Sequence, residues 1–86
     1  MRTNEEIARQ LQVTARTLTA QKQNLYRVRA YRRAAETILR LDRTVADLLR
    51  EEGKNYLSKF SGIGKHLVET ISHYAETGEW KMYTEL

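Results

Sequence analysis

The chain has 86 residues, a length that fits one small domain rather than two. It contains no cysteine, which excludes disulfides and thiolate-based zinc sites, and no apolar run approaches the ~20 residues of a membrane-spanning helix. Hydrophobic residues make up 41% of the chain, too many for a disordered tail, and the formal net charge is +4. Residues 1–9 have no apolar stretch typical of a secretory signal. The composition therefore predicts an intracellular, all-helical domain, and so short a chain favours binding over catalysis.

The positive charge is concentrated in two segments. Residues 16–43 contain eight basic side chains against two acidic ones, and residues 54–66 contain three lysines and no acid. The rest of the chain is neutral or acidic. Such segregation is typical of a protein that binds a polyanion such as nucleic acid, although a solvated basic face gives the same charge pattern.

In chain order, the first predicted helix covers about residues 4–20. Thr3 and Glu6 fit a capping box, and apolar residues recur at helical spacing from Ile7 onward. A polar connection over residues 21–24 separates this helix from the next.

The second predicted helix covers about residues 26–40 and has two different faces. Its predicted core positions are Tyr31, Ala34, Ala35 and Ile38. The opposite face carries the arginine stripe, which consists of Arg29, Arg32, Arg33 and Arg40. The apolar face predicts packing against a neighbouring helix, and the arginines predict an exposed cationic surface.

The second half of the chain predicts two short helices and a long one. Thr44 fits the cap of a short helix that Gly53 ends, and Asn55 fits the cap of another. The long helix covers about residues 65–77 and is followed by Gly78. The predicted fold class is all-α, a compact bundle of about four to five short helices.

Two glycines shape the turn before the long helix. Gly62 and Gly64 permit backbone angles or a close approach that a Cβ would prevent, and Ile63 between them is expected to insert into the core. The backbone N–H groups of Gly64, Lys65 and His66 lie at a helix N-terminus and have no intrahelical partners. They can hold a phosphate with help from the helix dipole, and Lys65 adds a positive charge.

This turn resembles the helix-hairpin-helix motif, a sequence-nonspecific binder of the DNA backbone, here over about residues 55–77. Residues 24–35, which read NLYRVRAYRRAA, are similar to a signature of the amino-terminal domain of the family X DNA polymerases, those related to polymerase beta. The two motifs occur in the family's order, and the likeness extends over nearly all of residues 1–86. The resemblance implies one domain that binds duplex, nicked or gapped DNA in DNA repair and contacts a 5′-phosphate. In these polymerases catalytic domains follow, so the resemblance implies catalytic domains in cis if this chain is a fragment.

The charge pattern and the resemblance together suggest two groups of DNA-binding residues. Those in or beside the hairpin are Lys59, Gly62, Gly64, Lys65 and His66. Those on the second helix are Arg27, Arg29, Tyr31, Arg32 and Arg33. The resemblance also implies that a monovalent cation, K⁺ or Na⁺, binds the backbone carbonyls of Ser58, Phe60 and Ile63. No other cofactor is expected.

Some members of the family also act as abasic-site (5′-deoxyribose phosphate) lyases, through a lysine that forms a Schiff base. The position of that lysine, six residues after the second glycine, is Thr70 here, and a hydroxyl cannot form an imine. Lys59 and Lys65 are alternative amines, but a neighbouring phosphate favours the charged form, whereas imine formation needs the neutral amine. A lyase with a substitute lysine therefore stays an alternative, and no catalytic residue is assigned. Ser61 also departs from the proline that often precedes the first glycine, which suggests a looser hairpin.

Other chemistries have less support. The two histidines are seven residues apart on one predicted helix, too far for one metal ion without further ligands, and both His73 and Glu69 are expected to be surface residues. A helical protein-interaction module is a third hypothesis, based on the aromatic tail from Trp80 to Leu86, which includes Tyr83. The tail is also expected to form a further turn packed on the bundle, and inward packing would remove the support for this hypothesis.

Overall fold

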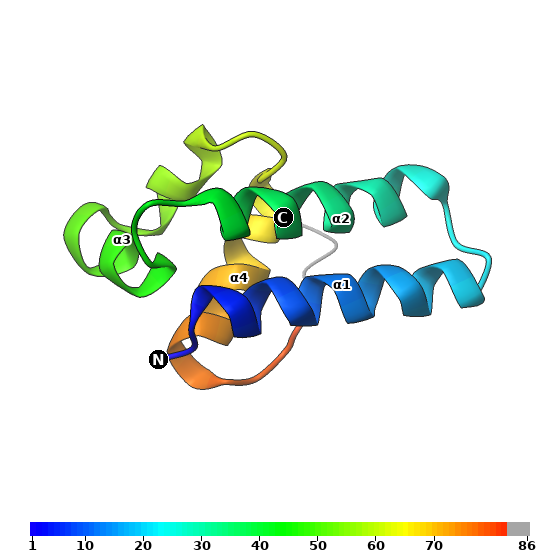
Figure 1. Cartoon of the computed structure of the whole chain (residues 1–86), viewed down its shortest axis with the longest axis horizontal. Helices are drawn as coiled ribbons and strands as arrows, with labels where there is room; N and C mark the ends of the chain where they lie inside the picture. The colour runs from blue at the N-terminus through cyan, green and yellow to red at the C-terminus, as the bar shows by residue number, and fades with distance from the viewer. Residues whose placement is uncertain (83–86) are drawn as a thin grey trace.

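Two long antiparallel helices, α1 (Asn4–Ala20) and α2 (Leu25–Arg40), pack along their length (Figure 1). The structure is a computed structural model in which residues 1–82 are described. The second half of the chain contains α3 (Val45–Glu52), the 3₁₀-helix η1 (Lys54–Lys59) and α4 (Lys65–Thr77). The helix α4 packs on η1, α3 and α1. The described chain therefore has two packing units: α1 with α2, and α3 with η1 and α4. Contacts between α1 and α4 join them.

The all-α prediction is confirmed, because the described part of the chain contains five helices and no strand. The boundaries of the first and last helices agree with those expected, and α2 begins one residue earlier than predicted. Within residues 1–82, no helix has the length and the apolar character needed to cross a membrane.

Side-chain caps determine where the first three helices begin. The Thr3 hydroxyl accepts the Glu6 N–H at 3.0 Å while the Glu6 carboxylate accepts the Thr3 N–H at 2.9 Å, which completes the predicted capping box. The Thr44 hydroxyl likewise accepts the Asp47 N–H at 3.0 Å. Asn24, expected to belong to the connection, is the cap of α2, because its side chain accepts the Tyr26 N–H at 2.7 Å.

The cap predicted at Asn55 is wrong. The Gly53 carbonyl accepts the Tyr56 N–H at 3.2 Å, so the turn of η1 already starts at Gly53 and contains Asn55 inside it. Gly53 itself has a φ of +86°, which ends α3 and turns the chain directly into the next helix. The six residues of η1 form a short 3₁₀ connector between α3 and the hairpin.

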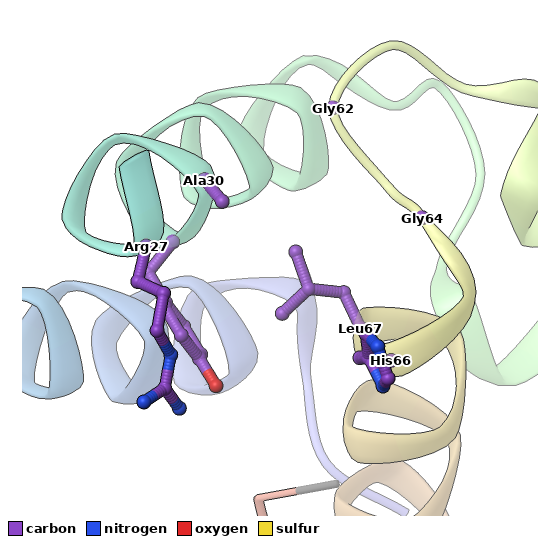
Figure 2. A pocket seen from close by; sticks show the side chains of 7 residues that line it. Arg27, Ala30, Gly62, Gly64, His66 and Leu67 are labelled. Carbon is purple, nitrogen blue, oxygen red and sulfur yellow. The ribbon is translucent and has the colours of Figure 1, made fainter. Parts of the chain in front are cut away.

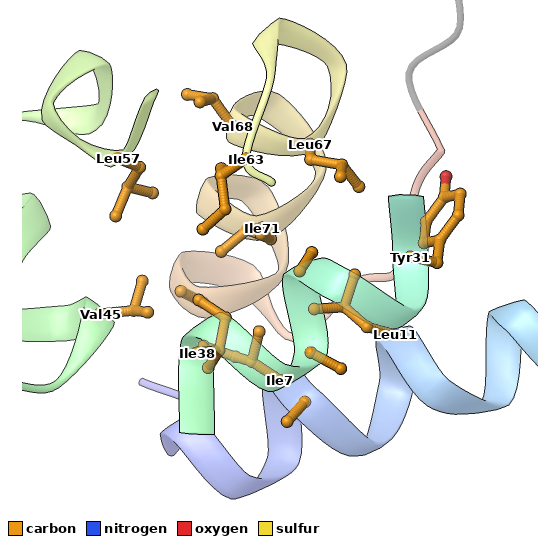
Figure 3. Packing of buried hydrophobic residues seen from close by; sticks show 14 of the residues in the cluster. Ile7, Leu11, Tyr31, Ile38, Val45, Leu57, Ile63, Leu67, Val68 and Ile71 are labelled. Atoms are coloured by element: carbon orange, nitrogen blue, oxygen red, sulfur yellow. The ribbon is translucent and has the colours of Figure 1, made fainter. Parts of the chain in front are cut away.

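The core lies where α1, α2 and α4 meet the inner sides of α3 and η1 (Figure 3). Ala34 and Ala35 have no exposed surface, and such small side chains allow α1 and α2 to approach closely. Ile63 is 3% exposed, so its predicted insertion into the core is confirmed. The expected core positions of α2 are all buried, together with Val28, which the periodicity did not single out.

The chain ends of the described region meet at the C-terminal end of α4. Trp80 packs edge-to-face on Tyr74 with ring centroids 5.3 Å apart, and Met82 is half-buried against the core. The Arg2 N–H donates to the Ala75 carbonyl at 3.1 Å. Residues 79–82 form no helical turn, but Trp80 and Met82 are partly buried against the core, which removes the part of the support for the protein-interaction hypothesis that rests on Trp80. The rest of the predicted aromatic tail, including Tyr83 and Leu86, lies outside the described residues.

Candidate nucleic-acid interface

A pocket of about 530 Å³ opens between α2 and the start of α4 (Figure 2). Its lining consists of Arg27, Ala30 and Tyr31 from α2, Gly62 and Gly64 from the hairpin, and His66 and Leu67 from α4. In Figure 2, Arg27 and His66 lie on either side of Leu67. The pocket thus combines an apolar lining with two nitrogen-bearing side chains from different helices.

Tyr31 contributes both to the core and to the pocket. Its side chain is only 5% exposed, and burial raises the pKa of its hydroxyl, an effect that the neighbouring Arg27 partly opposes. Arg27 and Tyr31 are four residues apart on α2 and therefore lie on the same side of the helix. The predicted core position of Tyr31 is confirmed, and the residue also lines the pocket, whereas its DNA-binding role stays a prediction.

The first turn of α4 is open to a ligand. Unlike α1, α2 and α3, this helix has no side-chain cap: its N-cap residue is Gly64. Its first intrahelical bond runs from the Val68 N–H to the Gly64 carbonyl at 2.9 Å, so the N–H groups of Lys65 and His66 precede the hydrogen-bonded part of the helix. These donors, the exposed Lys65 ammonium and the positive end of the helix dipole all favour an anion here.

The two hairpin glycines have different roles. Gly62 has a φ of +83°, and a Cβ there would overlap the Cγ of Arg33 and lie 2.6 Å from its Cδ. Gly64 has an ordinary φ of −89°, and a Cβ there would meet no atom within 4 Å. The expectation that the fold needs both glycines is therefore wrong for Gly64. Its missing side chain instead leaves open space beside the first turn of α4.

The predicted arginines of α2 are available for a ligand. Arg29, Arg32 and Arg33 are exposed, and within residues 1–82 none of them forms an ion pair. Outside α2, Arg2 pairs with Glu6, Arg43 with Glu51 and Glu52, and Arg50 with Asp47. Arg9 and Arg16 of α1 are exposed and, like the α2 arginines, form no ion pair within residues 1–82. Positive charge is therefore left unneutralised on α2, the helix that forms one wall of the pocket.

The lysines near the hairpin occupy separate places. Lys59 lies 5.1 Å from the ring centroid of Tyr56, in a cation–π contact. Lys65 borders a second hollow, on the other side of α4, where Lys54 pairs with Glu69 at 2.7 Å. Glu69, expected to be a surface residue, is partly exposed and also forms an ion pair.

The lyase hypothesis lacks an amine at the pocket. Thr70, the position at which the resemblance to the family X polymerases implies a lysine, has no exposed surface. Neither Lys59 nor Lys65 is among the described residues that line the pocket.

His73, expected at the surface, is half-buried, and its Nε2 lies 2.7 Å from the Glu79 Oε1.

The carbonyls expected to hold a monovalent cation belong to η1 and the turn that follows it. Ser58, Phe60 and Ile63 lie at the end of η1 and in the turn that leads to α4. The Phe60 carbonyl accepts the Ile63 N–H at 3.2 Å, and a carbonyl oxygen with one such bond keeps a second lone pair.

The sequence patterns missed one exposed aromatic side chain. Tyr26 is 80% exposed, and it borders a shallow hollow with Arg29, Arg33 and Gly62. The sequence did contain a signal for it, an aromatic residue among the arginines of α2. Proteins that bind single-stranded nucleic acid combine aromatic side chains, which stack on bases, with positive charge.

A family model described as a helix-hairpin-helix domain matches residues 2–80, which include α2, the hairpin and α4. No curated protein matches the chain.

Proposed function

Because the chain belongs to the helix-hairpin-helix domain family, we propose that it binds the backbone of DNA without sequence specificity and receives a 5′-phosphate at nicks and gaps. The observation that carries this proposal is the pocket itself, which joins Arg27 and His66 to the uncapped first turn of α4. Such a role implies that the protein acts inside the cell. Participation in DNA repair, with catalytic domains in cis, extends the proposal along the resemblance to the family X polymerases.

Phosphate contacts account for the lack of sequence specificity. Backbone N–H groups and arginine side chains bind phosphate oxygens, which are the same for every base pair. The N–H groups of Lys65 and His66 would hold one phosphate, and the unpaired arginines of α2 would contact others along the strand. Each neutralised phosphate releases counterions, so affinity should fall steeply as salt rises.

A terminal phosphate fits the pocket better than an internal one. A phosphate monoester carries between about 1.5 and 2 negative charges at neutral pH, whereas an internal diester carries about one. Arg27 and His66 line the pocket from two helices, and they would interact with the additional negative charge of the terminal phosphate. The apolar side chains of Ala30 and Leu67 would contact the attached sugar.

Tyr26 supports a preference for gaps. A base without a pairing partner has an accessible face, and stacking on an aromatic side chain contributes about 1–3 kcal/mol per base. Tyr26 is exposed next to Arg27, so it would reach such a base while the pocket holds the phosphate. A nick without missing nucleotides offers no such base.

A monovalent cation is part of the proposal. The carbonyls of Ser58, Phe60 and Ile63 would hold K⁺ or Na⁺, whose charge would favour a phosphate beside the hairpin. Replacing K⁺ and Na⁺ by a bulky organic cation at constant ionic strength should therefore weaken DNA binding. Unchanged affinity after this replacement would remove the cation from the proposal.

The decisive experiment compares affinities for intact, nicked and gapped duplexes, each with and without a 5′-phosphate, over a range of salt concentrations. We expect affinity to fall with salt for all of them and to be highest for the gapped duplex with a 5′-phosphate. Salt-independent binding would refute backbone recognition. Equal affinity with and without the phosphate would refute the terminal-phosphate pocket alone.

A further inference from the structure

Two side chains of α2 hold the hairpin loop. The Thr37 hydroxyl donates to the Ser61 carbonyl at 2.7 Å, across 24 positions of sequence. One turn earlier, the aliphatic stem of Arg33 lies directly against Gly62, where a Cβ would overlap it. Both contacts reach the segment of residues 61–62, which immediately precedes the inserted Ile63.

These contacts bridge the two walls of the pocket. The α2 wall packs on α1, whereas the α4 wall packs mainly on η1 and α3. The hairpin supplies Gly62 and Gly64 to the pocket lining and leads directly into the first turn of α4. The position of this loop relative to α2 therefore decides how far Arg27 lies from the open N–H groups of Lys65 and His66.

We propose that Thr37 is a positioning residue for phosphate binding. Its hydrogen bond to Ser61 fixes the loop on α2, so that Arg27 and the first turn of α4 reach the same phosphate. The inference rests on the proposed function, and it assigns to Thr37 no contact with DNA. The same bond would hold the hairpin in place without a proline at position 61, the residue that often precedes the first glycine in the resembled family.

The test uses the affinity gained from the terminal phosphate, which is the ratio of dissociation constants for gapped DNA without and with the 5′-phosphate. In Thr37→Val, which keeps the shape and removes the hydroxyl, this ratio should fall by about fivefold, the size expected of one hydrogen bond. Thr37→Ser keeps the hydroxyl and should restore the ratio. The dependence of affinity on salt should be the same in all three proteins, because no charge changes.

Thr17→Val is a matched control. The Thr17 hydroxyl donates to the Val13 carbonyl at 3.1 Å, within its own helix, so the same chemical change occurs away from the pocket. This variant should keep the ratio of the unchanged protein. If Thr37→Val fails to fold, Thr37→Ala removes the same hydroxyl with a better helix former.

A second readout needs no DNA. Amide hydrogen exchange at Ile63, whose N–H donates to the Phe60 carbonyl, should be faster in Thr37→Val than in Thr17→Val, while the midpoint of thermal unfolding stays similar. Unchanged exchange in Thr37→Val would overturn the inference. If the unchanged protein prefers DNA with the 5′-phosphate, an equal preference in Thr37→Val would overturn it too. If the unchanged protein does not distinguish the 5′-phosphate, the proposed terminal-phosphate pocket fails, and the positioning role fails with it whatever the exchange rates.

Discussion

Thr70 lies one helical turn after His66 on α4, yet Thr70 is completely buried whereas His66 is exposed at the pocket. The helix thus presents His66 to the pocket and buries the position at which the resemblance to the family X polymerases would place the amine of a lyase. The different exposure of these two positions separates phosphate binding from lyase chemistry, two activities that the resemblance to the family X polymerases implies together.

The first prediction concerns this separation. Incubation with abasic-site DNA and borohydride should give no covalent adduct, because the described residues that line the pocket include no lysine. A trapped adduct would contradict the prediction. Its loss in Lys59→Arg or Lys65→Arg would then identify the amine, since arginine keeps the positive charge and does not form the imine.

The second prediction concerns the unpaired arginines. Arg32→Gln should weaken binding to all duplexes alike and reduce the slope of log affinity against log salt by about one. Arg50→Gln removes the same charge from an arginine that pairs with Asp47, so its effect on the slope should be much smaller. Equal effects of the two changes would mean that net charge, rather than the surface of α2, controls binding.

The third prediction separates the two hairpin glycines. Gly62→Ala should lower the free energy of unfolding by about 1–2 kcal/mol or more, because of its positive φ and the overlap with Arg33. Gly64→Ala should lower stability less than Gly62→Ala, because alanine is a poorer N-cap than glycine but overlaps no atom at this position. It should weaken DNA binding, because a methyl group would enter the open space beside the first turn of α4. Denaturant unfolding and DNA titration of both variants provide the measurements. A Gly64→Ala protein with full affinity would show that no ligand approaches that point.

The fourth prediction concerns pH. The hydrogen bond from the Thr3 N–H lowers the pKa of Glu6 in the folded protein, as does the charge of Arg2. A lowered folded-state pKa means that the carboxylate stabilises the fold above its unfolded pKa and that this contribution disappears as pH falls through the folded pKa. The melting temperature of Glu6→Ala should therefore lie below that of the unchanged protein at pH 7, and the difference should shrink at pH 2–3.

Glu5→Ala provides the comparison for Glu6. Glu5 has the same charge, lies in the same first turn and makes no capping bond. Its removal should shift the melting temperature less than removal of Glu6 at pH 7. Equal shifts would assign the effect to the helix dipole rather than to the capping box.

Local patterns predicted most of the fold. The capping box at Thr3, the cap at Thr44 and the glycine after α4 depend on residues within one turn of each helix end, and the structure has all three. The cap at Asn55 failed because η1 starts from the Gly53 carbonyl, and an asparagine just before an apolar residue does not reveal that bond.

The site was less predictable, because it depends on contacts between distant segments. Hairpin and arginine patterns named residues on both walls, but only the folded chain brings Arg27 and His66 to one pocket. The bond from Thr37 to Ser61 and the pair of Lys54 with Glu69 join residues whose spacing carries no periodic sign. Such pairings follow from the packing of whole helices rather than from their individual sequences.

The pocket lies between two packing units, and this has a thermodynamic consequence. A ligand held by α2 on one side and α4 on the other resists their separation, so its binding free energy adds to the free energy of folding. At a ligand concentration 100 times the dissociation constant, the gain is about 2.7 kcal/mol, a large fraction of the stability of a small domain. If the proposed 5′-phosphate binding holds, a terminal phosphate would both select where this protein binds and raise the fraction of it that is folded.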